Sequence, residues 1–436
     1  MVTAGHQQLG LLALSLVVGI AVASPALGIP VIVLLLAVVV VAVLVDRYGT
    51  RSLALGCLML AGLFAPMNAL RLGGAVTVAD LFLVPCLILA VMARTAADAT
   101  PSSNRRPVRP DVLAGLLLIA GGILGSQFAV DLGASLSAII RFGLAAVGVP
   151  LVFVALGPSR SEVRLLSWAF IVGAAINSVA GVLTYNPLTR GIGLSIHSNH
   201  LATACLLASG LAAGLFLTGT RRSSWMAAAL WGVLAVGILK SGSRAGVVGE
   251  VLLILMLLVL TGSTRILRWC IGVVLGVAVL LFLNLIPYDE QDALARLIGR
   301  DPSAVAQSDF ERAQLRAKAV EGIEQHPLTG AGFEEARVAH NVYLQVWGAA
   351  GLIGLVGMAI LWIAALRGLL DGISGNPWVL GASAAVVSFL IVAAASNILW
   401  DRYLWFTLAL FVTGRTVHME ATAGAESPVG FSPTPV

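Results

Sequence analysis

The chain has 436 residues, of which 59% are hydrophobic and only 11% are charged, and its formal net charge is +5. Soluble globular chains carry about 25% charged residues, so this chain cannot cover a water-facing surface. The composition excludes soluble enzymes, nucleic-acid binders and disordered proteins. Continuous apolar runs exclude a β-barrel, whose strands alternate. The sequence therefore predicts an all-α integral membrane protein.

Apolar runs of spanning length predict about 12–14 transmembrane helices. They lie near residues 9–24, 28–45, 52–70, 77–93, 111–130, 137–156, 164–185, 199–218, 224–239, 245–261, 266–286, 342–366, 378–396 and 402–414. The basic clusters of short loops fall on one side when both termini are cytoplasmic, which predicts a multi-pass protein of the cytoplasmic (inner) membrane. We expect one polytopic domain over residues 1–418 and a disordered cytoplasmic tail over 419–436.

A long polar loop is expected on the outer face, from about residue 287 to residue 340. Loops of this length are usually functional or disordered. Ser308 and Glu311 have the spacing of a capping box, and the apolar residues that follow repeat with a helical period. We therefore predict an interfacial helix over Asp309–Gln325, after which the glycine-rich stretch Leu328–Phe333 turns the chain back.

Polar residues gather at the predicted outer ends of the spans. Each one alone has a plain structural explanation, such as an arginine that extends to the lipid headgroups. Together they place positive charge on the outer face, whereas membrane proteins usually concentrate it on the cytoplasmic side. We therefore expect these residues to bind an anionic, lipid-linked ligand. The four sets are Arg190, His197, Asn199 and His200; Lys240, Ser241, Ser243 and Arg244; His340, Asn341 and Gln345; and Asn397, Asp401 and Arg402.

The order of these motifs resembles the O-antigen ligase and O-antigen polymerase superfamily of bacterial envelope enzymes. SGSRAG at a span start is followed by the long loop with ERAQLRAKAVEGIEQHPLTGAGF, then AHNVYLQVWGAAGLIG, and finally an N-x-x-x-D-R-x-x-W segment. Upstream, RGIGLSIHSNHLA resembles the family's Arg-Gly stretch more loosely, with His197 and Ser198 where a proline is common. The resemblance covers residues 190–405, about half of the chain.

The resemblance implies a type C glycosyltransferase-like fold, an undecaprenyl-diphosphate-linked glycan donor, and a glycan or lipid-glycan acceptor. It implies no metal, cofactor or nucleotide sugar, and transfer with inversion. His340 corresponds to the proposed general base and Arg244 to the arginine that holds the donor diphosphate. Arg312 or Arg316 would be a second clamp, and the two are not distinguished at this point. The full set of expected substrate-binding residues is Arg190, Asn199, Arg312, Arg316, Asn341, Asn397 and Arg402.

Other functions remain open from the sequence. Intramembrane Glu250 and Asp401 would suit a lipid-linked glycan or small-solute transporter or flippase, although the polar residues lie at one face rather than at the midplane. A polytopic scaffold is a second alternative. A peptidoglycan-type glycosyltransferase would use a loop carboxylate, for which the candidates are Asp289, Glu290, Glu334 and Glu335. Ligase and polymerase are not distinguished either.

Overall fold

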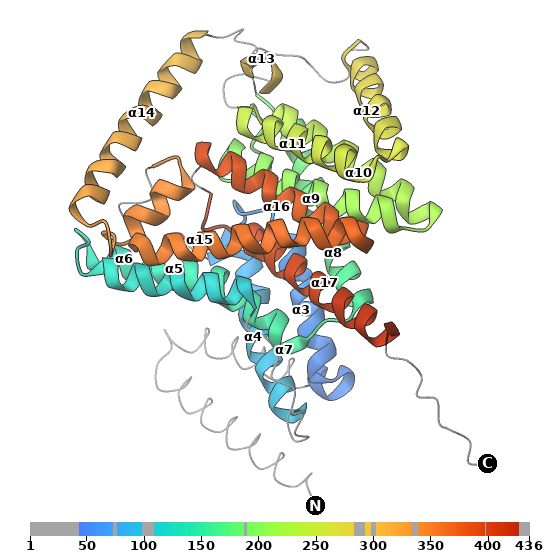
Figure 1. Ribbon diagram of the computed structural model, residues 1–436, viewed down its shortest axis with the longest axis horizontal. Coiled ribbons are helices and arrows are strands. Elements are labelled where there is room, and N and C mark those ends of the chain that lie inside the picture. The colour runs from blue at the N-terminus through green and yellow to red at the C-terminus, as the bar shows by residue number, and fades with distance from the viewer. Residues whose placement is uncertain are drawn as a thin grey trace, which may run out of the picture.

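A computed structural model describes residues 43–72, 76–97, 109–186, 190–282, 293–297, 302–333, 339–396 and 398–426 (Figure 1). The helices up to residue 183 are α3 (Thr50–Phe64), α4 (Val78–Ala97), α5 (Pro110–Ser126), α6 (Leu132–Gly143), the π-helical η1 (Leu144–Gly148), α7 (Val149–Leu156) and α8 (Arg160–Leu183). Those after it are α9 (Ser198–Thr218), α10 (Arg221–Lys240), α11 (Arg244–Thr261), α12 (Thr264–Phe282), α13 (Ala293–Leu297), α14 (Pro302–Gln325), α15 (Val342–Gly375), α16 (Pro377–Val392), the 3-10 turn η3 (Ala393–Ala395) and α17 (Arg402–Glu426).

These helices confirm an all-α integral membrane protein. Among the described residues, 8 helical segments are long and apolar enough to cross a membrane, and α3 and α5 are shorter apolar helices. Each predicted span that falls within the described residues coincides with a helix. The first predicted span and nearly all of the second lie outside the described residues.

The chain between α3 and α4 differs from the prediction of an uninterrupted span to residue 70. Helix α3 ends at Phe64, and Ala65 still has helical backbone angles. Pro66 then lacks the N–H that would continue the helical hydrogen bonds. A short antiparallel hairpin follows, made of β1 (Arg71–Leu72) and β2 (Val76–Thr77). This hairpin leads directly into α4.

Helices α9 and α16 form the centre of the bundle. Nearly every residue of both helices is buried, and they pack against each other, with α10 on another side of α9. Both helices are rich in Ala, Gly and Ser, whose small side chains let helix backbones approach closely. Helix α15 lies along α5 at the other side of the bundle (Figure 1).

The predicted turn after the interfacial helix is present and is bonded to a kink in α15. The kink lies at Gly351, whose φ is 59°. There the freed N–H of Leu352 donates to the carbonyl of Leu328 at 3.1 Å. The N–H of Ala331 likewise donates to the carbonyl of Gly348 at 2.6 Å. The glycine-rich turn is thereby held on α15 by backbone hydrogen bonds.

Two predicted boundaries were wrong. Helix α14 begins at Pro302 rather than at Asp309, because a proline is well tolerated at the first helical position, where its missing N–H has no helical partner. The spacing of Ser308 and Glu311 is therefore an ordinary i, i+3 spacing inside the helix. At the other end of the chain, α17 continues to Glu426 and occupies part of the predicted tail.

We expect Gly351→Ala to lower the free energy of unfolding by about 2 kcal/mol or more, because a Cβ at this positive φ would strain the backbone and meet the carbonyl of Leu328. Denaturation in mixed micelles measures the change. Gly272→Ala in α12 is the control, because a Cβ there meets nothing within 4 Å; it should be neutral or stabilise by about 0.5 kcal/mol. Equal effects of the two substitutions would contradict this account of the kink.

Candidate functional site

The turn between α10 and α11 presents an arginine at a helix start. Gly242 has a φ of 66° and lets the chain reverse. Ser243 caps α11, because its hydroxyl accepts a hydrogen bond from the N–H of Gly246 at 3.3 Å. Arg244 is therefore the first helical residue, and its Nη2 donates to Oδ1 of Asp309 at 2.5 Å. This contact joins the bundle to α14.

Helix α14 contributes arginines one turn apart to the same region. Nη1 of Arg312 lies 3.8 Å from Oδ1 of Asp309, so that one carboxylate oxygen contacts two guanidinium groups. The hydrogen bond from Arg244 holds the pKa of Asp309 below its usual value. The Arg312 side chain is only 20% exposed, whereas Arg316, one turn further along, is exposed. Of these two arginines, Arg312 is therefore the one that faces Arg244.

A cavity lies where these elements meet. Helix α13 brings Arg296 to it, and this buried side chain donates from Nη1 to the carbonyl of Gly242 at 2.9 Å. The side chains of Asn199, Arg244, Arg296 and Arg312 come from four different helices, and the complete lining is Asn199, Gly242, Ser243, Arg244, Ala245, Arg296, Arg312 and Ala395. Three guanidinium groups around one cavity make a strongly positive site, which suits a phosphate or diphosphate.

Arg190 adds positive charge to this region from the loop before α9. Its φ of 64° is unusual for a residue other than glycine. The next residue, Gly191, donates its N–H to the carbonyl of Lys240 at 3.0 Å, which attaches the loop to the turn before α11. Burial lowers the pKa of Arg190, and the charges of Arg312 and Arg244 lower it further. Arg190 therefore lies within electrostatic reach of the cluster.

His340 lies directly before α15 and has a φ of 45°, again in the left-handed region. Its Nδ1 atom is buried and has no hydrogen-bond partner among the described residues. Burial lowers the pKa of His340, and the positive charges of Arg312 and Arg316 lower it further. The imidazole is therefore neutral near pH 7, which is the form that accepts a proton.

His197 lies in the same electrostatic environment. Its Nδ1 atom caps α9 by accepting a hydrogen bond from the N–H of Asn199 at 3.1 Å. Burial lowers its pKa to about 4, and the nearby charges of His200, Arg190, His340 and Arg312 act in the same direction. The starts of α9, α11 and α15 and one face of α14 therefore converge on one region of the protein.

Two predicted substrate-binding residues, Asn341 and Arg402, bond to groups of the protein itself. Asn341 caps α15, because its Oδ1 atom accepts hydrogen bonds from the N–H groups of Tyr343 and Leu344. Arg402 forms a two-pronged ion pair with Asp80, at 2.9 and 2.8 Å, away from the arginine cluster. Asn397 lies outside the described residues, as do Asp289, Glu290, Glu334 and Glu335. The side chains of Asn341 and Arg402 thus have structural partners.

A buried polar network connects the elements next to the site. Nδ1 of His200 lies 2.8 Å from Oδ2 of Asp401, and Nδ2 of Asn68 donates to Oδ1 of the same carboxylate at 2.7 Å. Tyr403 donates its hydroxyl proton to Asp401 at 3.2 Å. This network joins the segment after α3 to the starts of α9 and α17, and so fixes the end of α9 that carries His197.

Sequence reasoning missed Arg296, Asp309 and Asn68. Arg296 lies in the part of the loop where no helix was predicted, and Asp309 was treated only as the first residue of a helix. Asn68 falls within a stretch predicted to be a span. The acid beside the arginines could have been noticed from the i, i+3 spacing of Asp309 and Arg312, but its pairing with Arg244 could not.

An O-antigen ligase family model matches residues 227–359. The matched segment contains Arg244, Arg296, Asp309, Arg312 and His340, whereas Arg190 and Asn199 precede it. The match confirms the resemblance to the O-antigen ligase and polymerase superfamily that the motifs indicated. A comparison with curated proteins found no match.

We expect Asp80→Asn to lower the free energy of unfolding by about 3–5 kcal/mol, because it leaves the half-buried guanidinium of Arg402 without its counter-ion. The matched control is Glu162→Gln, which breaks the more exposed pair with Arg51 and should cost about 1 kcal/mol or less. Thermal unfolding in detergent distinguishes the two. If Asp80→Asn is as mild as the control, the pair does not anchor α17.

Proposed function

Because an O-antigen ligase family model matches residues 227–359, we propose that the protein transfers a glycan from an undecaprenyl-diphosphate-linked donor to an acceptor hydroxyl, as a ligase or a polysaccharide polymerase. The transfer takes place at the outer face of the cytoplasmic membrane. The observation that carries the proposal is that Arg244 and Arg312 both contact Asp309. The positive charge of Arg312 also lowers the pKa of His340, which places the histidine near the same cluster.

The arginine cluster supports the choice of a diphosphate leaving group. When the bond between sugar C1 and the diphosphate oxygen breaks, the electron pair remains on the diphosphate. Preorganised guanidinium groups stabilise this growing charge without reorganising. Asp309 now contacts both Arg244 and Arg312. A donor diphosphate would compete with this exposed carboxylate for the same nitrogen atoms.

Arg312 is the second diphosphate clamp in this proposal. Its side chain lines the cavity beside Arg244 and contacts the same carboxylate oxygen. Arg316 is exposed and does not line that cavity. We therefore assign Arg316 an electrostatic role toward His340 and the donor, and Arg190 and Asn199 a role in binding the donor near the cavity.

His340 acts as the general base. It takes the proton from the acceptor hydroxyl while the acceptor oxygen forms its bond to C1 and the diphosphate departs. Attack opposite the departing diphosphate inverts the anomeric centre. The lowered pKa supports this role, because it keeps the imidazole neutral beside the positive cluster.

The first experiment measures release of undecaprenyl diphosphate by the purified protein in detergent, with EDTA present and with the host's lipid-linked oligosaccharide as donor. We expect release by the wild type, loss of at least about 100-fold in kcat/KM for Arg244→Ala, and only partial recovery for Arg244→Lys, because an ammonium cannot form the bidentate fork. Arg221→Gln, at the start of α10, is the charge-matched control. Absence of release, with protein-dependent movement of the donor across a vesicle membrane, would favour a flippase instead.

The pH dependence tests His340 separately. His340→Ala should reduce kcat by about 10²–10⁴-fold and leave donor binding nearly unchanged. In the wild type, the acid limb of kcat/KM should lie below the ordinary imidazole pKa of about 6.5, because the folded protein keeps this base unprotonated as the pH falls. Arg316→Gln should move that limb to higher pH by removing a positive charge. An unchanged limb in His340→Ala would exclude this histidine as the base.

A further inference from the structure

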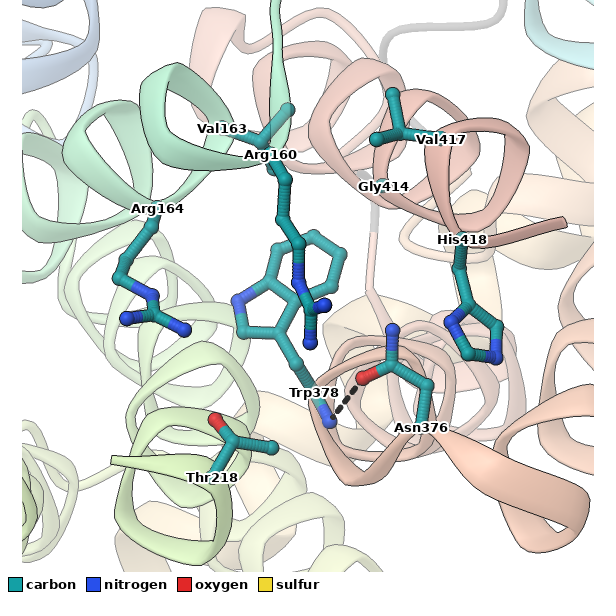
Figure 2. A pocket seen from close by; sticks show the side chains of 9 residues that line it. All are labelled: Arg160, Val163, Arg164, Thr218, Asn376, Trp378, Gly414, Val417 and His418. Carbon is teal, nitrogen blue, oxygen red and sulfur yellow. Dashed lines mark hydrogen bonds between the residues drawn. The ribbon is translucent and has the colours of Figure 1, made fainter. Parts of the chain in front are cut away.

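A second cavity lies at the other end of the bundle, between the start of α8, the end of α9, the start of α16 and the second half of α17 (Figure 2). Helix α9 begins beside the arginine cluster and ends at Thr218, which lines this second cavity. A helix of 21 residues is about 30 Å long, the thickness of the hydrocarbon core. The two cavities therefore belong to opposite faces of the membrane.

Two arginines of α8 point into this cavity. Arg160 and Arg164 lie one turn apart, and both line the cavity; in Figure 2 the Arg160 guanidinium overlaps the Trp378 indole and that of Arg164 lies to the left. Neither arginine has an ion pair with a described residue. Glu162, between them in sequence, is bonded instead to Arg51 at 2.7 and 2.8 Å.

Two other arginines, Arg109 and Arg415, have acidic partners among the described residues. Arg109 pairs with Asp111 at 2.6 Å, and Arg415 pairs with Asp371. Arg160 and Arg164 line the cavity without such a partner, so the described residues do not supply their counter-ion.

Trp378 is an independent sign of a ligand. Its side chain is buried, with the residue only 8% exposed, and its indole Nε1 has no hydrogen-bond partner among the described residues. A buried N–H without an acceptor is unfavourable by about 1–3 kcal/mol. The ring fits here because residue 414 is a glycine, and a Cβ at Gly414 would collide with it. Trp378 therefore lines the cavity and carries a buried donor that lacks its acceptor among the described residues.

We propose that this cavity binds the phosphate group of an anionic lipid headgroup, with Arg160, Arg164 and the indole N–H of Trp378 as its donors. A free phosphate ion offers the same chemistry. The lipid is favoured because the cavity opens between the ends of predicted spans, where basic pockets hold acidic headgroups.

Bound in this way, a lipid joins the ends of four helices. The phosphate supplies the acceptors for α8 and α16, while α9 and α17 complete the walls. The site is separate from the glycan transfer proposed above and does not depend on it. Its occupation should stabilise the fold, because a ligand that binds only the folded state shifts unfolding to higher temperature.

The test uses the full chain, purified in detergent and stripped of lipid. Its thermal midpoint is measured while dihexanoyl phosphatidylglycerol, dihexanoyl phosphatidylcholine or inorganic phosphate is added. We expect phosphatidylglycerol to raise the midpoint most. Arg160→Gln with Arg164→Gln should weaken its apparent affinity at least about tenfold, the effect of one lost charge-assisted hydrogen bond. Trp378→Phe keeps the ring and should weaken the affinity by about threefold or more.

Two controls make the outcome decisive. Arg221→Gln with Arg222→Gln removes two charges at the start of α10 that are not part of the cavity lining, and should leave the affinity within about twofold. Arg244→Ala removes the main anion contact at the opposite end and should also leave it unchanged. Saturation by inorganic phosphate alone, with the same sensitivity to the cavity variants, would support the site with free phosphate as its ligand. An equal response to phosphatidylcholine, or a response lost in Arg244→Ala and kept in the cavity variants, would overturn the proposal.

Discussion

The contact between Arg244 and Asp309 connects the two parts of the candidate site. One residue starts a helix in the bundle, and the other lies on α14, which reaches across the end of the bundle (Figure 1). At the other end of α14, His326 stacks on Phe128 at 4.3 Å between ring centroids. The helix is therefore held at both ends, and Arg312 is brought to the cavity beside Arg244.

The contact between Arg244 and Asp309 also explains how several arginines can lie close together in the folded protein. Arginines that face one another repel, and burial makes this repulsion stronger because water screens it less. A carboxylate between two guanidinium groups lowers that repulsion. The Asp309 side chain is 49% exposed, so it could turn toward water if the proposed diphosphate took its place. The acid thus stabilises the arginine cluster without blocking the proposed binding.

The two ends of the bundle use arginine differently. At the end with His340, arginines from separate elements converge, and Arg244 and Arg312 both contact Asp309. At the opposite end, Arg51, Arg109 and Arg415 each pair with an acid, whereas Arg160 and Arg164 line a cavity without an ion pair to a described residue. A residue count cannot distinguish these arrangements, since both are short basic segments beside apolar runs. The two arrangements differ in which carboxylate, if any, each guanidinium group contacts.

The sequence by itself determined the membrane class, the helical architecture and most of the segments that meet at the arginine cluster. These follow from local properties: the length of apolar runs, the scarcity of charge, and motifs such as KSGSRAG and AHNVYLQVWG. Only the tertiary structure decided which side chains pair with one another. It joined Arg244 to Asp309 across the long loop, assigned Arg402 to Asp80, and made Asn341 a helix cap. The physical reason is that an ion pair depends on a few ångströms of separation, and folding sets that distance between residues far apart in the chain.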